Sequence, residues 1–93
     1  TADAYFWSGE LFLAQDMFED AKLSFKNVVA NFYQHSRTPD SLFKLGEIYR
    51  IKGDVERSLE YYDKVKEDFP DSGASQLAKK SQEILKEESN LVE

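Results

Sequence analysis

Cysteine is absent from the chain, proline and glycine are scarce, and basic residues are fewer than acidic ones. Without cysteine, the chain can form neither a disulfide framework nor a thiolate metal site, and this absence fits the cytosol and a periplasmic space alike. The 12 Lys and Arg residues face 18 Asp and Glu residues, and no cluster of basic residues along the sequence reverses the resulting charge of −6. We therefore expect no nucleic-acid partner, because phosphate attraction would have to overcome the overall field.

Long apolar runs are also missing. None approaches the roughly 18–20 residues that span a bilayer, so we expect no membrane insertion. No signal peptide is visible and the chain begins at Thr1 without Met, so we expect an excised domain or a processed product. With 93 residues, of which 41% are hydrophobic, the chain has the size and composition of one folded domain.

Residues with catalytic or metal-binding chemistry are few. His35 is the only histidine, and no second histidine or EF-hand spacing of carboxylates accompanies it, so we expect a surface side chain in a turn. The chain contains no P-loop, nucleophile elbow or dinucleotide fingerprint. We therefore expect no enzyme activity, no metal and no cofactor. A catalytic or small-ligand role would need a buried polar pocket.

What the sequence does contain is a repeat of 37 residues. Its identical positions fall on one recurring hydrophobic pattern, which chance would not produce. The identical pairs at this offset are Phe6 with Phe43, Gly9 with Gly46, Glu10 with Glu47, Glu19 with Glu56, Val28 with Val65, and Phe32 with Phe69. Each copy shows the apolar periodicity of two consecutive helices.

Polar residues and glycine mark where these helices begin and end. We expect Asp16 to cap the second helix of the first copy, in a capping box with Glu19. Thr38 is expected to cap the first helix of the second copy. Gly53 then ends that helix and Asp54 caps the next.

The predicted domain covers residues 1–88. Repeat 1 spans about 2–33, repeat 2 about 38–70, and a capping helix about 73–88, with a frayed tail over 89–93. The apolar stripe expected on the capping helix consists of Leu77, Ala78, Ser81 and Leu85.

Both copies match the tetratricopeptide pattern W-x₂-L-G-x₂-Y, then A-x₃-F, then Pro. The second copy reads Leu42-x₂-Leu45-Gly46-x₂-Tyr49, Ser58-x₃-Tyr62 and Pro70, and the first reads Tyr5-x₂-Ser8-Gly9-x₂-Phe12 and Ala21-x₃-Phe25, with Tyr33 in place of the proline. The chain therefore resembles the tetratricopeptide repeat family. The resemblance implies an all-α, right-handed helical repeat of two helix–turn–helix units plus a C-terminal capping helix. It also implies an adaptor that binds a protein or peptide partner.

Three segments, at residues 4–10, 39–46 and 69–72, are also similar to the periplasmic Tol–Pal-associated cell-division coordinators. This narrower resemblance covers about residues 3–86 and implies a periplasmic location, with partners among the Tol–Pal envelope components. The family's proline after Phe32 and its coiled coil are not found in this chain. A structural segment of a longer solenoid, or a protein like the outer-membrane assembly lipoproteins with similarly long repeats, is the alternative.

The tetratricopeptide resemblance further implies that the first helices of the repeats line a groove for a partner. The positions carried over from the family are Asp3, Phe6, Glu10, Leu13, Asp40, Phe43, Glu47, Arg50, Lys80 and Ile84. Packing between the repeats is the alternative role for Phe6 and Phe43, and ordinary solvated charge is the alternative for Glu10 and Glu47. The mixed apolar and acidic character predicts a ligand with an apolar anchor and a basic group.

A second surface is predicted at Tyr5, Trp7 and Leu11, on the helix face that would meet a preceding repeat. A solvated patch of this kind is unusual for a stable monomer, so either upstream sequence covers it or two chains pair there. The alternative is a partly exposed Trp7 that lies along its own repeat.

Overall fold

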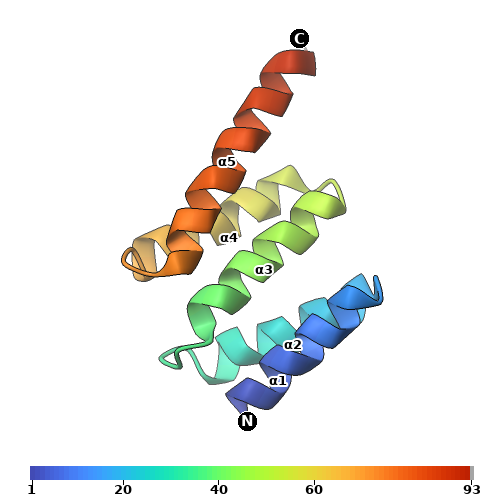
Figure 1. Ribbon diagram of the computed structural model, residues 1–93, viewed down its shortest axis with the longest axis vertical. Helices are drawn as coiled ribbons and strands as arrows, with labels where there is room; N and C mark the ends of the chain where they lie inside the picture. Colours follow the sequence, from blue (N-terminus) through green and yellow to red (C-terminus); the bar gives the residue numbers. More distant parts are fainter. Residues whose placement is uncertain (93) are drawn as a thin grey trace.

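The computed structural model describes the backbone of residues 1–92 and the side chains of residues 1–88, and over the described residues it contains five α-helices and no strand. The helices are α1 (Ala2–Ala14), α2 (Phe18–Asn31), α3 (Thr38–Ile51), α4 (Val55–Asp68) and α5 (Gly73–Val92). Figure 1 shows α1, α3 and α5 in one layer, with α2 and α4 behind them. The predicted all-α helical repeat is therefore confirmed, with one helix pair in each copy.

The helix boundaries follow the repeat closely. The α1–α2 pair occupies the first predicted copy and the α3–α4 pair the second. The last helix continues to Val92, past the predicted end at residue 88. Fraying of the tail stays a prediction, and Glu93 lies outside the described residues. None of the helices described combines the length and apolarity that crossing a membrane requires.

The turn between α1 and α2 differs from the prediction. Asp16 does not cap α2: it has φ = 59°, the only positive φ among the described non-glycine residues, and Met17 is the N-cap without a side-chain hydrogen bond. The equivalent residue in the second copy is Gly53, with φ = 84°. The capping-box prediction for Asp16 and Glu19 was therefore wrong, because Asp16 ends α1 in the left-handed conformation that short polar residues tolerate.

The other capping predictions have mixed outcomes. Asp54 is the N-cap of α4, and its carboxylate accepts a hydrogen bond from the Arg57 N–H at 3.1 Å. Thr38 is not an N-cap: it is the first residue of α3, after Arg37, and its buried hydroxyl donates to the Phe32 carbonyl at 2.7 Å. Thr38 therefore ties the start of α3 to the end of α2 rather than closing its own helix.

Two glycines allow the close packing within each helix pair. A Cβ atom on Gly9 would lie 2.7 Å from the Phe25 ring, and one on Gly46 would lie 2.5 Å from the Tyr62 ring. Such distances are well inside van der Waals contact, so each glycine makes room for the aromatic ring of the following helix. Ser58 completes the second contact, since its buried hydroxyl donates to the Gly46 carbonyl at 2.8 Å.

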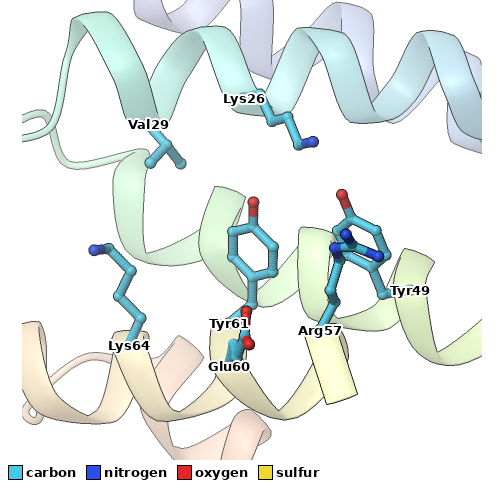
Figure 2. Close-up of a pocket in the computed structure, with 7 residues that line it drawn as sticks. All are labelled: Lys26, Val29, Tyr49, Arg57, Glu60, Tyr61 and Lys64. Atoms are coloured by element: carbon cyan, nitrogen blue, oxygen red, sulfur yellow. The ribbon is translucent and has the colours of Figure 1, made fainter. Parts of the chain in front are cut away.

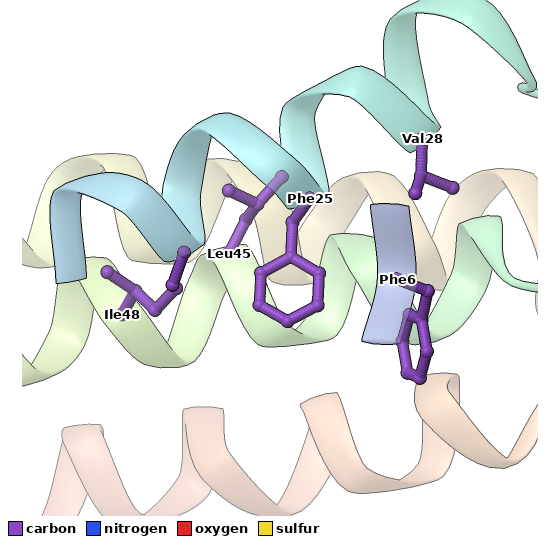
Figure 3. Close-up of a cluster of buried hydrophobic side chains, with 6 residues drawn as sticks. Phe6, Phe25, Val28, Leu45 and Ile48 are labelled. Carbon is purple, nitrogen blue, oxygen red and sulfur yellow. The ribbon is translucent and has the colours of Figure 1, made fainter. Parts of the chain in front are cut away.

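The core consists of two clusters that follow the repeats. The first joins α1, α2 and α3 through Phe6, Ala21, Phe25, Val28, Leu45 and Ile48, as Figure 3 shows. The second joins α3, α4 and α5 through Leu42, Tyr62, Val65, Ala74, Ala78 and Leu85. Val29 and Tyr61 pack against both clusters and connect them. Leu77, which we predicted to lie on the core stripe of the last helix, is instead exposed.

The last helix packs on α3 and α4 with one side only. On α3, the side toward α4 carries Leu42, Gly46 and Tyr49, and the equivalent residues of α5 are Lys79, Glu83 and Lys86. All three charged residues are exposed. This side of α5 is therefore suited to water rather than to a further helix, as expected for a capping helix.

Candidate functional site

The ten predicted groove residues lie on α1, α3 and α5, and we call the surface that carries them the front face. Exposure differs widely within this set. The exposed members are Asp3, Lys80 and Ile84, the half-buried members are Glu10, Leu13, Asp40, Phe43, Glu47 and Arg50, and the buried member is Phe6. The fold therefore brings nine of the ten to a surface that a partner can reach.

Phe6 belongs to the core instead. Its side chain is 4% exposed, and its ring lies 5.7 Å from the Phe25 ring in an edge-on arrangement. The Arg37 guanidinium covers the ring at 4.9 Å. Phe6 therefore packs between the repeats, which is the alternative role given for it above.

Phe43, its counterpart in the second copy, is only half-buried. Its ring packs on the second core cluster and lies 6.0 Å from the Tyr62 ring. Part of the Phe43 side chain stays accessible on the front face. It can therefore serve as the floor of a binding surface while it also contributes to the core.

Three of the predicted acidic residues have basic partners within the chain. Asp3 pairs with Arg37 at 3.1 Å, joining the start of α1 to the start of α3. The other two ion pairs link Glu10 with Lys44 at 3.3 Å and Glu47 with Arg50 at 3.0 Å. The front face is therefore less acidic than the sequence suggested, because Arg37 and Lys44 were not predicted there.

Glu47 has a second partner below the surface. The buried Tyr62 hydroxyl donates a hydrogen bond to its carboxylate. Burial raises the pKa of Tyr62, and this hydrogen bond raises it further. Hydrogen bonding to Glu47 also raises the pKa of Arg50. Glu47 is thus held in a fixed position by the core on one side and by Arg50 on the other.

The predicted groove residues include Ile84 but omit Leu77, a second apolar residue of the front face. Leu77 and Ile84 on α5 are each 50% exposed. At the repeat offset, Leu77 corresponds to Asp40 and Ile84 to Glu47, so both lie on the side of α5 that continues the front face. The repeat offset is the signal that places Leu77 here, whereas its apolar character alone favours the core.

The second predicted surface is also exposed. Trp7 is 52% and Leu11 65% exposed, and Tyr5 is exposed as well. Trp7 nevertheless has contacts in its own chain, since its ring lies 5.4 Å from the Phe6 ring and 5.0 Å from the Arg37 guanidinium. Leu11, in contrast, is the most solvent-exposed of the large apolar residues described.

The potential metal ligands of the chain are its carboxylates and a single histidine. Within the described part of the chain, no three His, Asp or Glu residues lie close enough together to hold a metal ion. His35 is half-buried rather than a free surface side chain, and its Nδ1 accepts a hydrogen bond from the Arg37 N–H at 3.1 Å. His35 therefore has a local structural role in the turn before α3.

Comparison with known proteins gives one family. The model of the tetratricopeptide repeat matches residues 3–34 and 40–72, which together make up more than half of the chain. The two matched segments cover nearly all of the α1–α2 and α3–α4 pairs. No curated protein matches the sequence. The family model therefore agrees with the repeat both in its spacing and in its helices.

Proposed function

We propose that this chain, which belongs to the tetratricopeptide repeat family, is an adaptor that binds another protein through its front face. Members of the family are typically scaffolds rather than catalysts. The observation that supports the front face most directly is the exposure of Leu77 and Ile84 on α5, together with the half-buried Phe43 on α3. Apolar side chains that meet a polar surround are typical of protein-binding surfaces.

The contacts of the front face indicate the chemistry of its partner. Leu77, Ile84 and Phe43 would receive an apolar side chain, and burying one such side chain contributes roughly 1.5–3 kcal/mol. A basic group of the partner would approach Glu10 and Glu47, where it must replace Lys44 or Arg50. Since ion pairs near the surface contribute only about 0–1 kcal/mol, this exchange costs little. We therefore expect an amphipathic segment whose apolar side determines affinity.

The test uses residues that the core does not need. Replacing Leu77→Lys and Ile84→Lys removes the exposed apolar surface of α5 and should weaken partner binding at least about tenfold, as expected from losing one buried apolar side chain. Leu23→Lys, at an exposed apolar residue of α2 in the other layer, is the matched control. Partners are identified by pull-down from the source organism and mass spectrometry, then measured by titration. Equal binding by wild type and the double variant would exclude the front face.

We also propose a more specific setting, in which the chain acts in the bacterial periplasm with Tol–Pal envelope components during cell division. The support is the similarity of residues 4–10, 39–46 and 69–72 to the coordinators of that process. Fractionation of cells that carry the full gene tests the location. Titration with purified periplasmic domains of the Tol–Pal proteins tests the partner. A cytosolic protein, or the absence of binding, would leave the general adaptor role but exclude this setting.

Self-association through α1 is a second proposal, and the exposure of Trp7 and Leu11 favours it. In this arrangement two chains bury Tyr5, Trp7 and Leu11 against each other. Sedimentation equilibrium should show dimers that dissociate in the Leu11→Glu variant. A monomer at high concentration, with fully solvated Trp7 fluorescence, would favour the alternative of an upstream repeat in a longer solenoid.

A further inference from the structure

A cavity of about 390 Å³ lies between α2 and α4, in the layer behind the front face. Figure 2 shows that Tyr49 and Tyr61 point their hydroxyls into it, and that Lys26 reaches toward them from α2. The residues that line it are Lys26, Val29, Tyr49, Arg57, Glu60, Tyr61 and Lys64. Its volume falls at the lower end of the range for ligand sites, about 300–1,000 Å³, and suits one or two side chains.

The charge of this cavity is opposite to that of the whole chain. Three cations, Lys26, Arg57 and Lys64, line it together with one carboxylate, Glu60, whereas the chain has a net charge of −6. No basic cluster is visible along the chain, because Lys26 lies on α2 whereas Arg57 and Lys64 lie on α4. Packing of both α2 and α4 against α3 brings these cations around a common space.

Two of the three cations are available to a ligand. Arg57 pairs with the Asp54 carboxylate at 2.7 Å. Among the side chains described, in contrast, no carboxylate forms an ion pair with Lys26 or Lys64. Each is instead held near an aromatic face: Lys26 Nζ lies 5.6 Å from the centre of the Tyr49 ring, and Lys64 Nζ lies 5.6 Å from the centre of the Tyr33 ring. Such contacts position an ammonium group without neutralising its charge.

The tyrosines make the base of the cavity rigid. The Tyr49 and Tyr61 rings are stacked at 5.5 Å with 9° between their planes, and Tyr61 packs on both core clusters. Burial raises the pKa of Tyr61, and hydrogen bonding with Tyr49 raises that of Lys26. At neutral pH the cavity therefore presents fixed hydroxyl donors beside charged ammonium groups, an arrangement that stabilises a carboxylate.

We propose that this cavity binds an acidic segment of a partner protein, with Lys26 and Lys64 pairing with its Asp or Glu carboxylates and the tyrosine hydroxyls donating to them. Charge complementarity supports this occupant, since the cavity is a basic spot on an acidic molecule. A nucleic acid fits less well, because its continuous charge would meet the negative field around this small site. The site is separate from the front face and does not depend on binding there.

The test measures binding of a fluorescein-labelled hexaglutamate peptide to the 93-residue protein, by fluorescence anisotropy and by amide NMR shifts. The Lys26→Glu, Lys64→Glu double variant should bind at least about tenfold more weakly, the effect of losing one charge-assisted contact. The matched control is Lys79→Glu with Lys86→Glu, which makes the same change in net charge on exposed residues of α5. The control should bind within about twofold of wild type.

Several results would overturn the proposal: no binding at low salt, equal losses in both double variants, or shifts that map away from α2 and α4. Tighter binding of a uridine hexanucleotide than of the peptide would indicate that the site binds nucleic acid instead. Circular dichroism must show that the variants are folded. If charge reversal unfolds the protein, peptide binding by the Lys26→Gln, Lys64→Gln variant is compared with that by the control variant Lys79→Gln, Lys86→Gln.

Discussion

The turn between α1 and α2 is a weak point that can be repaired by copying the turn of the second repeat. Asp16 occupies the left-handed position, with φ = 59°, where the second repeat has Gly53. Met17 is the N-cap of α2 but provides no side-chain hydrogen bond, whereas Asp54 caps α4. We predict that the Asp16→Gly, Met17→Ser variant is more stable than wild type.

The two substitutions act through different terms. A left-handed conformation costs an ordinary L-residue about 1–2 kcal/mol, and it costs Asp less. Glycine avoids this cost but loses about 0.5–1 kcal/mol of additional entropy on folding. We therefore expect Asp16→Gly to stabilise the folded state by roughly 0.5 kcal/mol. A serine N-cap contributes about 1 kcal/mol relative to an uncapped end. We choose serine rather than aspartate for position 17. In the second repeat Arg57 supports the Asp54 cap, but the equivalent residue of the first repeat is Asp20, which has the same charge as an aspartate cap.

The expected gain is about 1.5 kcal/mol in the free energy of unfolding, which for a domain of this size raises the melting temperature by roughly 6–12 °C. Thermal and urea unfolding followed by circular dichroism measure it. Met17→Ala separates the cap from the loss of the methionine side chain, and Asp16→Ala should destabilise, since alanine tolerates the left-handed region poorly. The reasoning is refuted if Met17→Ser is no more stable than Met17→Ala, or if Asp16→Gly destabilises.

Three further predictions concern the second repeat and its contacts. Gly46→Ala places a Cβ 2.5 Å from the Tyr62 ring and should destabilise by about 1–3 kcal/mol in urea unfolding, whereas Gly73→Ala, with open space around it, should not. Ser58→Ala removes the 2.8 Å hydrogen bond to the Gly46 carbonyl and should cost about 1 kcal/mol, and no loss would mean that the alanine at the equivalent position of the first repeat serves as well. Burial and a hydrogen bond to Asp68 raise the pKa of Tyr33 to about 12. The unfolded chain ionises first, so this contribution to stability is present below the ordinary tyrosine pKa and is lost between about pH 10 and 12. Comparison of wild type with Tyr33→Phe over this range measures it, and parallel pH profiles would refute it.

The fold could be predicted because one pattern occurs twice. At the 37-residue offset Gly9 aligns with Gly46 and Phe25 with Tyr62, and in the structure each aromatic ring packs against the glycine of its own repeat. The turn at Asp16 could not be read with equal certainty. Aspartate is favoured both as an N-cap and in the left-handed conformation, and only the alignment with Gly53 distinguishes the two roles.

The binding surfaces were harder to predict, because they depend on how the helices are rotated against each other. The pairing of Glu10 with Lys44 requires α1 and α3 to lie side by side at one register, and the sequence alone did not determine that register. The basic cavity requires the same knowledge for α2 and α4. Leu77 shows a different difficulty. It is apolar and adjacent to the buried Ala78, so the periodic pattern alone does not distinguish it from a core residue, although it is exposed.

The two sides of the helix array differ in a way that separates the two binding proposals. The front face combines apolar side chains with carboxylates that already have partners, so affinity there should come from apolar burial and change little with salt. The cavity between α2 and α4 presents Lys26 and Lys64, which form no ion pair with any carboxylate among the side chains described, so its affinity should fall steeply as salt is raised. An adaptor with two such sites can hold two proteins at once, because the occupied surfaces lie in different layers of the array. A salt titration of each interaction therefore indicates which surface a given partner uses before any residue is replaced.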